Sequence, residues 1–275
     1  MTTLMQRLQD AKTETVFWLQ DTADALLGRR DPLIPPRRLM FDGPRDPAIF
    51  RANGQEFLGH YRNLAELRPD EAMLDIGCGI GRKTIPLVTY LSPPGRYAGF
   101  DINRTGIDWC RAHITARYPN FQFDYVDIYN RRYNPQGKVA GAELRFPYPD
   151  SSFDFVAAAS VFTHMFTAEV ANYLAESARV PKPGGRALFT FFLLNEESQT
   201  RLATPASTYH FSHAQGDYRV ENLARPEDAV AYEESFVAGL YAAAGLHIRQ
   251  TFYGGWSGRP DRVSFQDMIL AEKPA

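Results

Sequence analysis

The sequence has few of the features that mark a secreted, membrane-spanning or nucleic-acid-binding protein. Its two cysteines are Cys78 and Cys110, and the first falls inside a glycine-rich stretch, so we expect no structural disulfide and a cytoplasmic location. The longest nearly uncharged runs, such as VAAASVFTHMFT, are too short and too polar to cross a bilayer. The first residues mix charges throughout, unlike a secretory signal. A formal net charge of −2 gives no reason to expect a general affinity for nucleic acid or acidic membranes.

What is present is enough apolar material for one sizeable core, since 44% of the 275 residues are hydrophobic. Leucines and alanines recur at helical spacing over residues 4–26, and a proline-rich connection follows. A second helix is expected over residues 49–67. We therefore expect an N-terminal helical extension or cap over residues 1–65.

From residue 66 to residue 275, short apolar runs alternate with amphipathic segments and turns. Such alternation predicts a parallel sheet covered by helices. The expected strands are residues 73–76, 97–101, 121–126, 153–159, 186–194, 247–252 and 263–271. The expected helices are residues 83–91, 105–117, 168–179 and 226–244, and a polar, histidine-bearing stretch lies at 196–225.

The stretch LDIGCGIGR at residues 74–82 places a strand before three alternate glycines and a helix. The glycines let the backbone turn tightly and approach a ligand without interference from a Cβ atom. The dinucleotide fingerprint would put its third glycine at Arg82, whereas here it comes at Gly81. Asp75, just before the loop, suits a ligand with a cationic end better than a pyrophosphate, although it could also cap its own turn.

Two further carboxylates end the next two predicted strands. Asp101 can accept hydrogen bonds from both hydroxyls of a ribose, and Asp127 can accept one from an exocyclic amine while the Ile128 backbone donates. Taken singly, Asp101 is also a candidate helix N-cap and Asp127 a candidate loop residue. Ligands of open α/β sheets lie beyond the carboxyl ends of the strands, so we expect all three acids to face one crevice. A nucleoside with a zwitterionic amino-acid tail fits them, and S-adenosylmethionine is such a molecule.

The motifs LDIGCGIGR, YAGFDI, RFPYPDSSFDFV, ASVFTHM and ARVPKPGGRALFT, with Asp127, resemble successive motifs of class I S-adenosylmethionine-dependent methyltransferases. The resemblance covers residues 66–275. It implies a Rossmann-like α/β fold, with a seven-stranded, mostly parallel sheet, an antiparallel last strand and helices on both faces. It also implies that the turn at 77–81 lies under the methionine portion of the cofactor. The residues expected to bind S-adenosylmethionine, and its product S-adenosylhomocysteine, are Asp75, Gly77, Gly79, Ile80, Gly81, Arg82, Asp101, Ile102, Asp127, Ile128 and Ala159.

The residues that act on the methyl acceptor are expected after the fourth and later strands. An alcohol must lose a proton as it attacks the methyl group, and a positioned base typically raises the rate of such a reaction by ~10²–10⁴-fold. His164 is the first candidate for this base, with helix capping or orientation of the acceptor as its other roles, and Glu196 is the second. Tyr253, Trp256 and Arg259 are expected to bind the acceptor, although Trp256 could instead be a packed hinge residue.

Three segments of this sequence are additional to the shortest members of the family, and we expect them to contribute to binding of the cofactor or the acceptor. The stretch MFDGPRDPAIF could fold over the cofactor, and insertions near 129–144 and 196–225 are expected to contribute to the acceptor site. His210 and His213 lack a fixed third ligand, so we expect no metal.

The sequence therefore predicts an enzyme that methylates a hydroxyl of a small molecule, with a sugar or oligosaccharide as the favoured acceptor. Two alternatives stay open. One is an N- or C-methyltransferase acting on an amine, a quinone or another small metabolite. The other is a non-catalytic module that binds S-adenosylmethionine. We expect neither nucleic acid nor a membrane as a partner.

Overall fold

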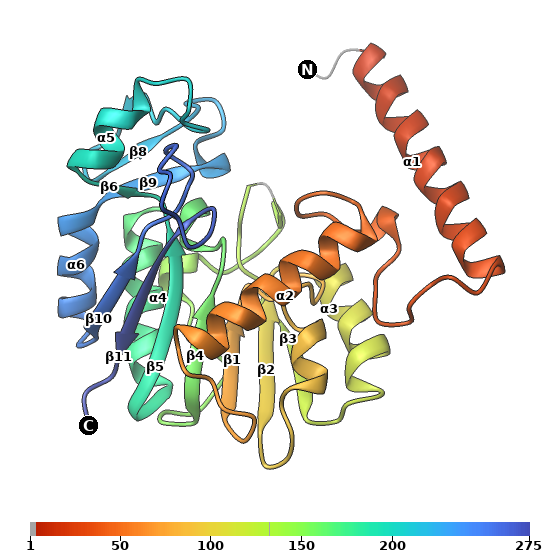
Figure 1. Cartoon of the computed structure of the whole chain (residues 1–275), viewed down its shortest axis with the longest axis horizontal. Coiled ribbons are helices and arrows are strands. Elements are labelled where there is room, and N and C mark those ends of the chain that lie inside the picture. Colours follow the sequence, from red (N-terminus) through yellow and green to blue (C-terminus); the bar gives the residue numbers. More distant parts are fainter. Residues whose placement is uncertain (1–3, 132) are drawn as a thin grey trace.

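The computed structural model describes residues 4–131 and 133–275, with side chains described from residue 11 onward. Its centre is a seven-stranded sheet in the order β10-β11-β5-β4-β1-β2-β3 (Figure 1). The pairings among β1 to β5 are parallel, and β11 runs antiparallel to both β5 and β10, so the expected fold is confirmed. The strands are β1 (Ala72–Ile76), β2 (Arg96–Asp101), β3 (Phe121–Tyr125), β4 (Phe153–Ala158), β5 (Pro181–Phe191), β10 (His247–Phe252) and β11 (Asp267–Glu272).

Helices cover both faces of this sheet. Neighbouring residues of β1 point to opposite sides, because side chains alternate along a strand. Met73 joins a core packed against α2 (Pro47–Asn63) and α3 (Arg104–Cys110), whereas Leu74 joins a core packed against α4 (Thr167–Arg179) and α6 (Glu234–Ala243). Both side chains are fully buried. The loops that follow β1, β2 and β4 therefore gather at one edge of the sheet, where ligands of such folds bind.

The N-terminal extension consists of α1 (Leu4–Leu26), the turn η1 (Arg37–Leu39) and α2, and α1 stands apart from the sheet in Figure 1. The end of α1 is tied to η1 because the buried Asp21 carboxylate accepts hydrogen bonds from the backbone amides of Arg37 and Arg38. Asp46 then caps the N-terminus of α2. Of the described helices, none is both long and apolar enough to span a membrane.

Residues 193–233 hold a second sheet, in the order β6-β9-β8-β7, which the sequence did not predict. Its strands are β6 (Leu193–Leu194), β7 (His213–Ala214), β8 (Tyr218–Val220) and β9 (Val230–Glu233), with α5 (Glu196–Leu202) after β6. The helix predicted over 226–244 is wrong at its start, because η6 (Pro226–Asp228) and β9 precede α6. Val230, Ala231 and Tyr232 are all buried, and a short continuous buried run cannot be assigned to helix or strand by periodicity.

Two other predicted helices are shorter and less regular than expected. Residues 83–91 contain only the 3-10 segment η2 (Ile85–Thr89), and residues 105–117 form α3 followed by the π-helical turn η3 (Arg111–Thr115). The 3-10 turns η4 (Gly141–Glu143) and η5 (Phe162–His164) flank β4. The turn η5 carries His164, a few residues beyond the carboxyl end of β4.

Candidate functional site

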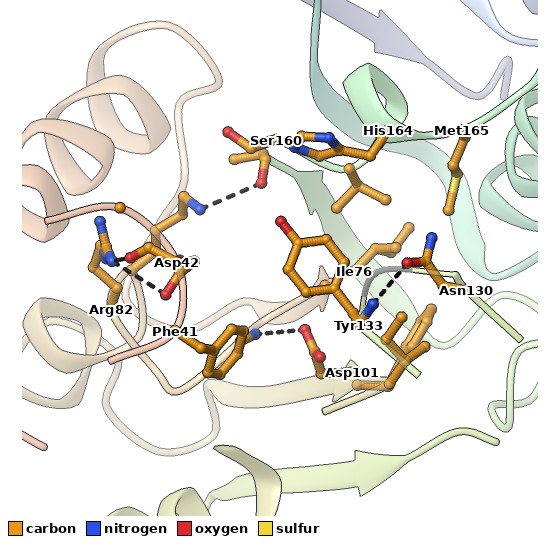
Figure 2. A pocket seen from close by; sticks show the side chains of 18 of the residues that line it. Phe41, Asp42, Ile76, Arg82, Asp101, Asn130, Tyr133, Ser160, His164 and Met165 are labelled. Atoms are coloured by element: carbon orange, nitrogen blue, oxygen red, sulfur yellow. Dashed lines mark hydrogen bonds and ion pairs between the residues drawn. The ribbon is translucent and has the colours of Figure 1, made fainter. Parts of the chain in front are cut away.

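A cavity of about 430 Å³ lies at the carboxyl edge of the central sheet (Figure 2). Cavities that bind cofactors and other small molecules typically measure ~300–1,000 Å³. The ends of β1, β2 and β4, with the glycine loop, η5 and α4, form part of its wall. The N-terminal extension, the 129–144 insertion and the connections of the second sheet also contribute to it. Of the residues expected to bind the cofactor, six line this cavity: Gly77, Gly79, Arg82, Asp101, Ile102 and Ala159.

The glycine loop after β1 forms one wall of the cavity. Gly77, Gly79 and Gly81 have φ values of 70°, 60° and 85°, a region that favours glycine. A Cβ atom on Gly77 would lie 2.5 Å from the Val161 side chain, so that position has no room for any side chain. The Gly77 amide donates to the Phe100 carbonyl oxygen at 2.9 Å, which holds the loop against the end of β2.

Asp101 is the last residue of β2 and faces the cavity in Figure 2. One carboxylate oxygen accepts from the Gly79 amide at 2.8 Å, and the other accepts from the Asn103 amide at 2.7 Å. Burial raises the pKa of Asp101 to about 6, against the opposing effect of these two backbone donors. Asp101 therefore connects the glycine loop to the start of α3 and presents a carboxyl group to the cavity.

Asp75 does not line the cavity, contrary to our expectation. Its side chain is 1% exposed, and its Oδ2 accepts a hydrogen bond of 2.8 Å from the Tyr97 hydroxyl, which also bonds Thr84. Burial raises the pKa of Asp75 to about 6. The physical reason for the correction is its position within β1, where the side chain turns into the core beside α2. Ile80 is fully buried, and a Cβ on Gly81 would meet Ile114, so the structure brings neither residue into the cavity wall.

Asp127 and Ile128 also lie outside the cavity wall, because the 129–144 insertion folds back onto them. Asp127 Oδ1 accepts from the Tyr125 hydroxyl at 2.8 Å and from the Asn134 amide nitrogen at 3.4 Å. The same Asn134 amide donates to the Ile128 carbonyl oxygen at 2.9 Å, and the Ile128 side chain is buried. Tyr133 from this insertion projects into the middle of the cavity, between Asp101 and His164 (Figure 2).

Residues 41–43 of the N-terminal extension lie over the glycine loop. The Arg82 guanidinium forms an ion pair of 3.1 Å with Asp42 and also bonds the Asp42 carbonyl oxygen. Phe41 lies near both the glycine loop and α3, because a Cβ atom on Gly79 would lie 3.8 Å from its ring and a Cβ atom on Gly106 would lie 3.2 Å from it. The guanidinium of Arg82 thus connects the glycine loop to residues 41–43 through Asp42.

His164 lines the cavity on the side near β4, across the cavity from Asp101 (Figure 2). Its Nδ1 lies 2.8 Å from the backbone carbonyl oxygen of Glu227, in η6. A carbonyl oxygen can only accept, so Nδ1 must carry the hydrogen and donate it. In the neutral ring the lone pair is then on Nε2, which makes Nε2 the atom able to accept a proton. The Tyr133 ring stands 6.2 Å from the imidazole, edge to face.

Comparison with known proteins agrees with this arrangement. Residues 74–189 match a family model described as a methyltransferase domain. This part of the chain is therefore a methyltransferase domain, in agreement with its resemblance to class I S-adenosylmethionine-dependent methyltransferases. A solved S-adenosylmethionine-dependent methyltransferase from Methanosarcina mazei shares the fold at 19% identity and a TM-score of 0.50, over 77% of this chain and 96% of that one. The [4+2]-cyclase SpnF shares it at 17% identity and a TM-score of 0.53, over 82% and 81%.

Curated relatives of the methyltransferase domain act on different acceptors, by their names. The demethylmenaquinone methyltransferase of Symbiobacterium thermophilum is 29% identical, over 43% of this chain and 41% of its own length. The 27-O-demethylrifamycin SV methyltransferase of Amycolatopsis mediterranei is 30% identical, over 48% and 42%. The fatty-acid O-methyltransferase of Mycolicibacterium smegmatis is 32% identical, over 43% and 36%. The chain thus spans less than half the length of these relatives.

The structure does not bring the other predicted acceptor-site residues to the cavity of the methyltransferase domain. Glu196 is exposed at the start of α5. The Tyr253 hydroxyl donates to Glu234, and the Arg259 guanidinium lies 2.6 Å from a Glu197 oxygen and 4.2 Å from the Tyr253 ring centre. These contacts join α5, α6 and the β10–β11 connection to one another.

Trp256 is 1% exposed and packs against Phe192 and Phe211, with ring centroids 5.4 Å apart in both pairs. Its indole Nε1 donates to Asp267 Oδ2 at 2.7 Å. The packed alternative considered for Trp256 is therefore the one that matches its surroundings, and the residue is part of a core below the second sheet.

Several residues that line the cavity were not singled out from the sequence. They are Asn53, Phe57, Lys83, Asn130, Tyr133 and Tyr209, among others. The stretch MFDGPRDPAIF was expected near the cofactor, and its Phe41 and Asp42 are there. Lys83 had a usable signal, because it directly follows the glycine loop. Tyr209 had none, since it is positioned by packing against Phe192 and Phe265, which are distant in the sequence.

Proposed function

We propose that this protein is an S-adenosylmethionine-dependent methyltransferase that holds its cofactor in the cavity of Figure 2 and methylates a hydroxyl of a small molecule. The cavity volume suits an adenosyl cofactor, and the backbone of Gly77 and Gly79 can be approached closely because neither residue has a side chain. Asp101 would accept the ribose hydroxyls, with Ile102 beside the base and Ala159 near the amino-acid end. When bound, the cofactor supplies a methyl group on a sulfonium.

His164 would act as the base that accepts the proton of the acceptor hydroxyl. The observation that carries this assignment is the 2.8 Å contact of Nδ1 with the Glu227 carbonyl oxygen, since it fixes the tautomer with Nε2 as acceptor. Orienting a base in this way also lowers the entropy cost of bringing it to the reacting hydroxyl. Tyr133 and Met165 lie beside His164 in the cavity (Figure 2) and would exclude water from this end.

The test compares His164→Ala with Glu196→Gln, which removes the charge of the second predicted base. We expect His164→Ala to lower kcat by at least about tenfold, the low side of the contribution of a positioned base, while the Kd of S-adenosylhomocysteine stays unchanged. Glu196→Gln should leave both constants unchanged, because Glu196 is exposed and outside the cavity wall. Unchanged turnover in His164→Ala would remove this residue from the mechanism.

A saccharide acceptor now has less support than a hydroxyl acceptor in general. Tyr253, Trp256 and Arg259, which motivated the saccharide, lie outside the cavity wall, and the ring that faces the His164 imidazole is the Tyr133 phenol. We therefore propose a phenol, quinol or other apolar alcohol alongside a saccharide in one panel of acceptors. Methyl transfer to an amine or carbon, with His164→Ala still fully active, would favour the N- or C-methyltransferase. Cofactor binding with no product on any acceptor would favour the non-catalytic module.

A further inference from the structure

Lys83 lines the cavity and has no part in the reaction described above. Its ammonium nitrogen lies 3.3 Å from the Ala159 carbonyl oxygen and 5.1 Å from the centre of the Phe57 ring. The neighbouring Arg82 is already neutralised by its ion pair with Asp42. Lys83, by contrast, forms no ion pair with a carboxylate of the residues that the structure describes. The cavity therefore holds a half-buried cation whose polar partner is a neutral carbonyl group.

We propose that Lys83 binds the carboxylate of the amino-acid end of S-adenosylmethionine, an inference that rests on the proposed function. The cofactor carries a sulfonium, an ammonium and a carboxylate, so the carboxylate is the one group that a lysine attracts. A cation within a partly buried site repels like charges more strongly than it would in water. Lys83 thus favours one direction of binding, in which the carboxylate lies toward its nitrogen and the sulfonium lies away from it.

The position of Lys83 agrees with this direction. Its nitrogen touches the carbonyl of Ala159, the residue near which the family resemblance places the amino acid. Asp101, which would hold the ribose, is the last residue of the neighbouring strand β2 and lies on the other side of the glycine loop. The cofactor would then run from Asp101 along Gly79 and Gly77 toward Lys83 and Ala159, with a hydrogen-bond acceptor at the ribose and a cation at the carboxylate.

The test compares two ligands that differ only in this carboxylate. S-adenosylhomocysteine carries it, and decarboxylated S-adenosylhomocysteine keeps the adenosine, the thioether and the ammonium. Isothermal titration gives the Kd of both ligands for the full chain, for Lys83→Met and for Lys83→Arg. Lys182→Met is the matched control, because Lys182 pairs with Asp154 at the opposite end of the strands.

We expect Lys83→Met to raise the Kd of S-adenosylhomocysteine by about 10- to 100-fold, as for the loss of one charge-assisted hydrogen bond. The Kd of the decarboxylated ligand should change by less than about twofold. Lys83→Arg should keep most of the preference for the carboxylate, and Lys182→Met all of it. Equal weakening of both ligands, or none, would overturn the assignment while leaving cofactor binding intact. Failure of the unaltered chain to bind either ligand would overturn the proposed function and this inference with it.

Discussion

Binding of the cofactor should depend on pH through Asp101. Burial raises the pKa of this carboxyl to about 6 in the free protein. Ribose hydroxyls that donate to Asp101 stabilise its ionised form, so the pKa falls when the cofactor binds. Linkage then requires that affinity decrease as the pH falls through 6. At pH 5 only about one Asp101 in eleven is ionised, so the Kd of S-adenosylhomocysteine should rise by about tenfold relative to pH 7.5.

Loss of folding would not mimic this effect. The pKa of Asp101 is raised above its ordinary value of 3.8, so the folded state binds this proton more tightly than the unfolded state does. The contribution of Asp101 to stability therefore falls as the pH rises from about 4 to about 6, and acidification from pH 7 to pH 5 stabilises the fold at this position.

Isothermal titration from pH 5 to pH 7.5 measures the dependence directly. The side chain in Asp101→Asn cannot titrate. The Kd of this variant for S-adenosylhomocysteine should therefore be higher than that of the unaltered chain at pH 7.5 and should not change across the range. Asp75 has a pKa raised to about 6 as well, but it is buried behind the loop with Tyr97, so Asp75→Asn should keep the pH dependence of the unaltered chain. A Kd that does not change with pH, or one that still changes in Asp101→Asn, would refute the assignment of Asp101 to the ribose.

Two further predictions concern stability. Gly77→Ala places a Cβ atom 2.5 Å from Val161 at a residue with a φ of 70°, so we expect a loss of about 2 kcal/mol or more in the free energy of unfolding, measured by urea denaturation. A change below about 0.5 kcal/mol would show that the loop adapts freely. Trp256→Phe leaves Asp267 without its indole donor and should cost about 1–3 kcal/mol, with the KM for an acceptor unchanged. A raised KM with unchanged stability would instead place Trp256 in the acceptor site.

The central sheet could be predicted because its information is local. Short apolar runs separated by turn residues mark β1 to β5 individually, and the glycine loop marks the edge at which a ligand binds. The second sheet could not be predicted in this way. His213–Ala214 and Leu193–Leu194 are too short to show a period, and β9 is defined only by its pairing with β6 and β8. Its consequence for the site is large, because the carbonyl group that orients His164 belongs to Glu227, just before β9.

The position of the predicted acceptor-site residues outside the cavity wall has a related reason. Glu196 was chosen because it follows a strand whose end faces the ligand, and Tyr253 and Arg259 were chosen because their residue types suit an acceptor. In the fold, these side chains interact with other side chains of the protein: Arg259 forms an ion pair with Glu197, and the Tyr253 hydroxyl donates a hydrogen bond to Glu234. Such partners come from helices distant in the sequence, so no local pattern predicts them.

The three strand-end acids show how finely position decides function. Asp75 precedes the last residue of β1, and its side chain enters the core, where Tyr97 satisfies it. Asp101 ends β2, so its carboxylate reaches past the sheet to the Gly79 amide and the cavity. Asp127 lies two residues beyond β3, where the insertion supplies Asn134 as a partner. The register pairs Asp75 with Gly99, two residues before Asp101, so Asp75 and Asp101 lie on the same face of the sheet and differ in how far along the strands they stand. Depth within the sheet therefore separates a carboxyl group packed in the core from one that reaches the cavity.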